Sequence, residues 1–265
     1  MLDLIGEPTE GFSKIIPLPT AGTQSLWMIS FTILASIVGA LIGGFIFGPF
    51  FLLSHKKVIG RKMIYGFQNR AQSNKFKGAF FKTLFPALLT VNFCLIFSSN
   101  STIQEIVLRN PGEDMDQMLT FSAILPLISG VSMAIFSPTW FLLDAGVVYT
   151  NKKKVENNSD PIEIRSVGGW YIYLMKGYAG ISVIFAFYTF YSNLASTVSD
   201  FSAGTVLIFI IWPIMPIFIA LMLILGIISL DMTFNKRREF IRKWANKFGI
   251  LESLEEASVL TRNEE

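Results

Sequence analysis

The chain has 265 residues, of which 52% are hydrophobic and only 15% charged, with 22 Lys and Arg against 19 Asp and Glu. Soluble domains carry about 25% charged residues, so this composition excludes an ordinary soluble protein and predicts a membrane protein. The single histidine, His55, excludes multi-histidine metal sites, and the single cysteine, Cys94, excludes intrachain disulfides.

Five uncharged, apolar stretches predict an all-α, polytopic bundle of five transmembrane helices, because roughly 20 residues cross a hydrocarbon core about 30 Å thick. The expected spans run over residues 26–51, 80–98, 118–148, 177–194 and 204–230. We therefore divide the chain into a lead-in, a transmembrane domain and a tail, at residues 1–24, 25–230 and 231–265. Pro126 and Pro138 predict a kinked or partly broken third span.

Small residues recur along the first expected span. They are Ala35, Gly39 and Gly43, with Gly44 and Gly48 on a second row. Small residues four apart let two helices approach backbone to backbone. This pattern is compatible with the seam of a homo-oligomer and with ordinary packing inside one bundle.

The loop at 55–82 orients the expected spans, because short loops rich in Lys and Arg stay in the cytoplasm. It has eight basic residues and no acidic one, and it begins with Lys56, Lys57, Arg61 and Lys62. With this loop inside, only Lys14 and Arg109 fall outside. We expect the amino terminus outside and the carboxyl terminus in the cytoplasm of a multi-pass protein of the cell membrane.

Apolar residues recur at helical spacing inside this basic loop, at Ile59, Met63, Ile64 and Phe67. Such a pattern predicts a basic amphipathic helix on the inner membrane surface. Two partners suit such a helix: the anionic inner leaflet and a cytosolic protein docked there.

Charge inside a membrane is costly and marks candidate functional residues. Asp144 and Lys176 lie toward the cytoplasmic ends of neighbouring expected spans. One hypothesis is an intramembrane pair between Asp144 and Lys176 that holds two helices or gates a pathway. The alternative is that each side chain reaches the interface by itself.

The tail combines an apolar helical face with strong positive charge. Phe240, Ile241 and Trp244 share the face, and the charge comes from Lys236, Arg237, Arg238, Arg242 and Lys243, among others. This pattern predicts a helix on the anionic inner leaflet, followed by an acidic end.

The sequence contains no HExxH motif, no phosphate-binding loop and no Gly-x-Ser-x-Gly elbow. We expect a non-enzymatic, permease-like or scaffold-like membrane subunit without a cofactor or a catalytic metal. Its basic face would bind anionic lipid and a cytosolic partner, and no nucleic acid, since orientation in the membrane already explains the basic residues. The alternative is a lipid-modifying membrane enzyme with a charge cluster at the inner interface.

Overall fold

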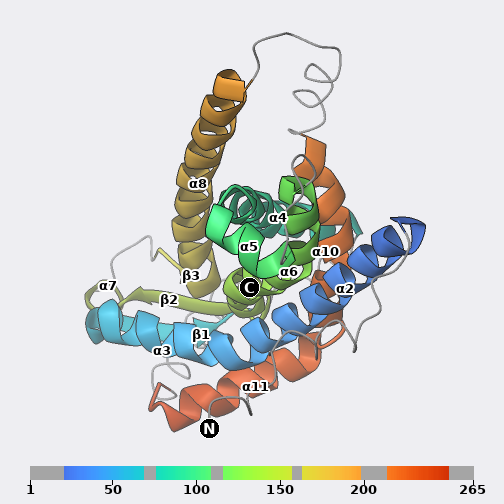
Figure 1. Cartoon of the computed structure of the whole chain (residues 1–265). Helices are drawn as coiled ribbons and strands as arrows, with labels where there is room; N and C mark the ends of the chain where they lie inside the picture. The colour runs from blue at the N-terminus through green and yellow to red at the C-terminus, as the bar shows by residue number, and fades with distance from the viewer. Residues whose placement is uncertain (1–20, 69–75, 109–115, 157–162, 198–213, 251–265) are drawn as a thin grey trace, which may run out of the picture.

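The computed structural model describes residues 21–68, 76–108, 116–156, 163–197 and 214–250, and it is mostly helical with one small sheet. The helical elements are α2 (Ala21–Ile42), the π-helical turn η1 (Gly43–Phe47), α3 (Gly48–Val58), the 3-10 turn η2 (Gly60–Lys62), α4 (Phe76–Ser98), α5 (Ser101–Leu108), α6 (Asp116–Asp144), α7 (Lys152–Glu156), α8 (Val167–Thr197), α10 (Met215–Asp231) and α11 (Phe234–Lys247). The strands are β1 (Met63–Phe67), β2 (Val147–Asn151) and β3 (Arg165–Ser166) (Figure 1).

Three helical segments of the described chain are long and apolar enough to cross a membrane: Leu26–Val58, Phe76–Ser98 and Thr120–Asp144. A fourth is added if α10 and the helix after it, bent by 68°, are counted as one broken span. The first three expected spans correspond to these segments. The fourth expected span lies within α8, and the beginning of the fifth, with the lead-in to residue 20 and the acidic end from 251, lies outside the described residues.

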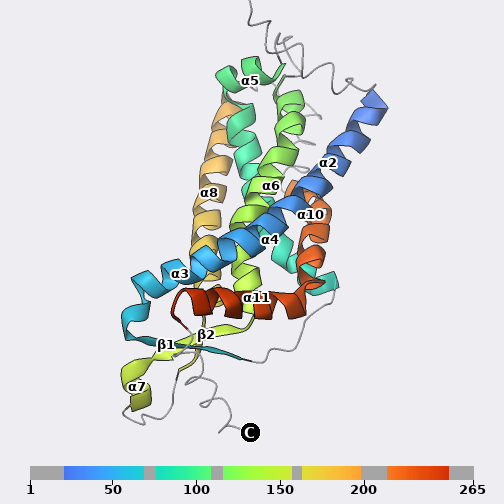
Figure 2. The same ribbon diagram turned by 90° about the horizontal axis from the view of Figure 1, so that it is seen from below.

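Four helices form a closed ring, in which α2 packs against α6 and α10, and α4 packs against the same two helices from the other side. The long helix α8 lies outside the ring, against α4 and α6. Figure 2 shows α11 lying across one end of this bundle, close to the sheet, with α5 at the opposite end.

The small residues of α2, η1 and the start of α3 pack against α6 of the same chain. A Cβ added to Gly39 would collide with the carbonyl oxygen of Gly130 on α6, and one added to Gly43 would collide with α6 at Ser137. Gly130 in turn lies against Ala35, and both Gly44 and Gly48 face the ring of Phe141 on α6. The glycine rows therefore allow the close approach of α2 and α6, which is the bundle-packing alternative.

The expected amphipathic helix around Met63–Phe67 is wrong, because these residues form strand β1. β1 pairs antiparallel with β2, with Met63 opposite Asn151 and Phe67 opposite Val147, and β3 pairs with the other edge of β2. Their β-branched and aromatic side chains suit a sheet, and a distant partner strand supplies the hydrogen bonds. The expected third span is also too long, since α6 ends at Asp144 and Gly146 adopts a positive φ of 75° before β2.

The apolar face of α11 was expected to lie in lipid, but it packs on the protein. Phe240 lies 5.2 Å from Phe45 and 6.3 Å from Phe141, measured between ring centroids. Ile241 and Ala245 are fully buried. The bend after α10 folds this helix back against α3 and α6, so the protein itself covers the apolar stripe.

Candidate functional site

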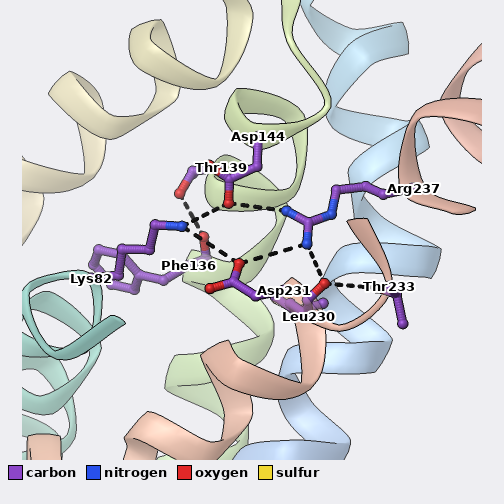
Figure 3. A network of polar contacts seen from close by, with 8 residues as sticks. All are labelled: Lys82, Phe136, Thr139, Asp144, Leu230, Asp231, Thr233 and Arg237. Carbon is purple, nitrogen blue, oxygen red and sulfur yellow. Dashed lines mark hydrogen bonds and ion pairs between the residues drawn. The ribbon is translucent and has the colours of Figure 1, made fainter. Parts of the chain in front are cut away.

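Four charged side chains from four helices meet at the end of the ring that α11 covers (Figure 3). The carboxylate of Asp144, at the end of α6, lies 2.7 Å from Lys82 Nζ of α4 and 3.0 Å from Arg237 Nη1 of α11. Asp231, at the end of α10, lies 3.6 Å from Lys82 Nζ and 3.7 Å from Arg237 Nη2. We call these four residues the ion-pair network.

Helix ends position the two carboxylates and the guanidinium. The last carbonyls of a helix lack intrahelical partners, and the Leu230 carbonyl of α10 accepts hydrogen bonds from Arg237 and from the Thr233 hydroxyl. Arg237 Cζ also lies 5.4 Å from the centroid of the Phe141 ring. The guanidinium is therefore held by two carboxylates, one carbonyl and one aromatic face at once.

The ion-pair network is nearly buried and electrically balanced, with two cations and two carboxylates. The exposed fraction of the side chain is 0% for Arg237, 13% for Asp231, 14% for Lys82 and 20% for Asp144. Buried charges are tolerated when they are paired and hydrogen-bonded, and removal of one partner leaves a charge that neither water nor protein compensates. The network therefore clamps α4, α6, α10 and α11 together.

The predicted pair between Asp144 and Lys176 is wrong, because Asp144 pairs with other residues. Lys176 is exposed on α8, and its ammonium lies 5.3 Å from the Phe85 ring centroid and 5.9 Å from that of Tyr173. Asp144 faces the ring interior instead and meets Lys82, the last basic residue of the loop at 55–82. Sequence spacing does not reveal which of several neighbouring helices an inward charge faces.

Arg237 was expected on the membrane surface and is instead fully buried. A signal for this was present, because Arg237, Ile241 and Trp244 recur at helical spacing, which places Arg237 on the apolar face of its helix. A charge on the apolar face of an otherwise basic amphipathic helix indicates a buried partner.

Several elements that carry exposed Lys and Arg residues meet at one end of the molecule, which we call the basic end (Figure 2). It is built from the end of α3, η2, the sheet, α7 and α11. Its exposed cations are Lys57, Lys62, Lys152, Lys153, Lys154, Lys236, Arg242, Lys243 and Lys247. Lys56 lies among them and donates a hydrogen bond of 2.7 Å to the Gly249 carbonyl, just after α11. The basic end is thus assembled from segments far apart in the chain.

An aromatic cluster around His55 fastens the sheet to the bundle. His55 is fully buried, and its Nδ1 lies 2.8 Å from the Tyr65 hydroxyl of β1. The rings of Tyr149, Trp170 and Tyr171 surround it, with centroids 4.6, 5.3 and 6.2 Å away. Burial, with the neighbouring phenols as a smaller effect, raises the pKa of Tyr65 above its ordinary range, so the phenol stays neutral.

Within the described residues, no group of three or more His, Cys, Asp or Glu side chains is arranged to hold a metal ion. The ion-pair network and the basic end are the two candidate functional features described above. No protein-family model, no curated protein and no solved structure matches this chain.

Proposed function

We propose that this chain is a non-enzymatic, scaffold-like protein of the cell membrane whose basic end lies on the cytoplasmic side and binds anionic lipid. The observation that carries the proposal is the gathering of exposed cations from α3, η2, α7 and α11 at one end of the bundle. The topology that accompanies it has five spans, an outside amino terminus and a cytoplasmic carboxyl terminus.

Electrostatics favour this placement. Each Lys or Arg near an anionic leaflet contributes about 1 kcal/mol of attraction, and this attraction falls off within a Debye length of about 8 Å at physiological salt. Asp144 and Asp231 are neutralised inside the ion-pair network, and the exposed cations of α11 outnumber its single acidic residue, Glu239. The exposed cations of the basic end therefore attract the same anionic surface together.

The packing inside the ring favours a scaffold over a permease. Met133 of α6 is fully buried, and a Cβ added to Gly226 of α10 would lie 2.8 Å from the Met133 side chain. The same Cβ would lie 2.7 Å from the carbonyl oxygen of Ser36 on α2. Three helices thus meet tightly at this level, so permease-like activity would require the ring to open and the ion-pair network to break.

The sheet and α7 extend the basic end beyond the helix bundle, as Figure 2 shows. α7 begins with three exposed lysines, Lys152, Lys153 and Lys154. A cytosolic partner would therefore be recognised through acidic side chains opposite this short helix.

A lipid-modifying enzyme is the second candidate, and one observation favours it: Asp144 and Asp231 converge beside Lys82. General acid-base chemistry requires such converging groups. Both carboxylates, however, are occupied by Lys82 and Arg237, which suits a structural clamp better than a proton donor. Loss of lipid turnover in Asp144→Asn, with folding and lipid binding intact, would favour the enzyme.

The test measures the lipid that accompanies the protein. The full chain is reconstituted in nanodiscs of phosphatidylcholine and phosphatidylglycerol, and the lipids retained on release are counted by native mass spectrometry. We expect enrichment of phosphatidylglycerol, and loss of much of it when Lys152, Lys153 and Lys154 are all replaced by Gln.

The matched control replaces the same three lysines of α7 by Arg, which keeps the charge and should keep the enrichment. High salt should reduce the enrichment in the wild-type protein, because exposed charges are screened. Equal retention of both lipids by the wild-type protein would refute the proposal.

A further inference from the structure

Two arginines of α11 lie against one ring at the end of the sheet. Arg238 Cζ lies 5.3 Å and Arg242 Cζ 5.5 Å from the centroid of the Phe67 ring. We propose that Arg238 and Arg242, positioned by Phe67, form a site for the phosphate group of a lipid headgroup, with preference for a phosphomonoester. This inference rests on the proposed function and assigns a chemically selective site to the basic end.

Phe67 is a fixed platform. It is the last residue of β1, its side chain is 8% exposed, and it stands opposite Val147 in the antiparallel ladder. The next residue, Gln68, donates its N–H to the Gly146 carbonyl at 2.8 Å. The sheet therefore holds the ring in place, and the two arginines are positioned on a surface that does not depend on them.

The arrangement brings like charges together. Arg238 and Arg242 are four residues apart on α11 and so lie on the same helical face, where like charges repel. The ring offsets part of this repulsion, because the negative face of an aromatic ring attracts a guanidinium. A bound anion would offset the rest, which makes the pair a better anion site than two separate cations.

Arg242 keeps its donors available. Its side chain is exposed, and the Phe67 ring is its contact in the described part of the chain. A contact with an aromatic ring uses the charge of the guanidinium and not its hydrogen-bond donors, so the N–H groups of Arg242 can still donate to an anion. Glu239, the acidic residue of α11, is exposed and forms no ion pair with either arginine in the described residues.

The ligand class follows from this chemistry. The planar fork of a guanidinium matches two phosphate oxygens, which a single ammonium does not. A phosphomonoester carries nearly two negative charges at neutral pH, so it suits two adjacent cations better than a phosphodiester with one. Because α11 lies across the end of an apolar helix bundle, the phosphate it meets belongs to a membrane headgroup.

The experiment uses the full chain in mild detergent and measures its affinity for dioctanoyl phosphatidic acid, dioctanoyl phosphatidylserine and glycerol 3-phosphate by microscale thermophoresis. We expect the wild-type protein to bind phosphatidic acid most tightly. Arg242→Lys keeps the charge and loses the planar fork, so it should weaken phosphatidic acid binding by about ten-fold. Lys176→Gln, which removes an exposed charge from α8 outside the basic end, should change it by less than about two-fold.

A second variant tests the platform. Phe67→Leu keeps both arginines and removes the ring, and it should also weaken phosphatidic acid binding while leaving the affinity for phosphatidylserine close to that of the wild type. Its folding is checked by the unreactive state of buried Cys94 toward a thiol dye. Added salt should not restore the phosphatidic acid binding of this variant, because salt weakens every ionic contact.

Several outcomes would overturn the inference. Equal affinity for phosphatidic acid and phosphatidylserine, or an unchanged Arg242→Lys variant, would show diffuse attraction and leave the proposed function standing. Glycerol 3-phosphate binding as tightly as phosphatidic acid would assign the site to a soluble phosphate. If the wild-type protein bound neither lipid, the inference and the proposed function would fail together.

Discussion

Replacing Arg237 by Met removes one of the two cations of the ion-pair network and keeps an unbranched side chain against Phe141. Lys82 is then the single cation beside Asp144 and Asp231, so the network carries one uncompensated negative charge. We expect this change to destabilise the helix bundle strongly, because the lost guanidinium is fully buried and contacts both carboxylates.

The magnitude follows from burial. Removing one partner of a buried ion pair costs about 3–5 kcal/mol. The lower end applies, since the side chains of Asp144 and Asp231 remain 20% and 13% exposed and water partly solvates them. A loss of about 3 kcal/mol corresponds to a lowering of the melting temperature by about 6–12 °C for a protein of this size class.

The chain contains its own reporter for this measurement. Cys94, the only cysteine, is fully buried in α4 and becomes accessible to a fluorogenic thiol dye on unfolding. The melting temperature of each variant in detergent is read from the dye signal on heating. No engineered cysteine is needed.

The control restores the charge balance. The double variant Arg237→Met with Asp231→Asn leaves one cation, Lys82, and one carboxylate, Asp144, which lie 2.7 Å apart. We expect it to be more stable than the single variant by about 1 kcal/mol or more, because contacting residues do not act additively. If the double variant lost as much as the sum of its parts, or the single variant lost less than about 1 kcal/mol, charge balance would not be what holds the four helices.

Two further predictions use the same dye. Gly39→Ala should lower the melting temperature, because its new Cβ meets the backbone of α6. Gly177→Ala, whose new Cβ would have nothing within 4 Å, should leave the melting temperature unchanged or raise it. Similar shifts for both variants would contradict the tight contact between α2 and α6. Lys82→Met should destabilise the protein by several kcal/mol and Lys176→Met by less than about 0.5 kcal/mol; the reverse order would support a pair between Asp144 and Lys176.

The site was partly predictable. Asp144 stood out because an ionisable group near a long apolar run is expensive and requires a partner. Its actual partners, Lys82 and Arg237, lie 62 and 93 residues away in the chain. Their identity depends on which helices become neighbours in the ring, and no local pattern contains that information.

The sheet, like the ion-pair network, could not be predicted from local sequence alone. Val147, Val148, Tyr149 and Thr150 are a β-branched and aromatic run that favours a strand. Its first two residues, Val147 and Val148, fall inside the expected third span because they follow an apolar stretch directly. β1 lies far from it in sequence, and a strand is stable only once its partner is beside it.

The sequence by itself determined the positions of the three apolar helices that are long enough to cross a membrane, because the length of an apolar run is a local property of the chain. The tertiary structure decided which charges pair, which face of α11 is covered and that Arg237 is buried while Arg242 is exposed. These outcomes depend on which helices pack together, and that choice is made by close contacts such as Gly39 on Gly130 between segments far apart in the chain.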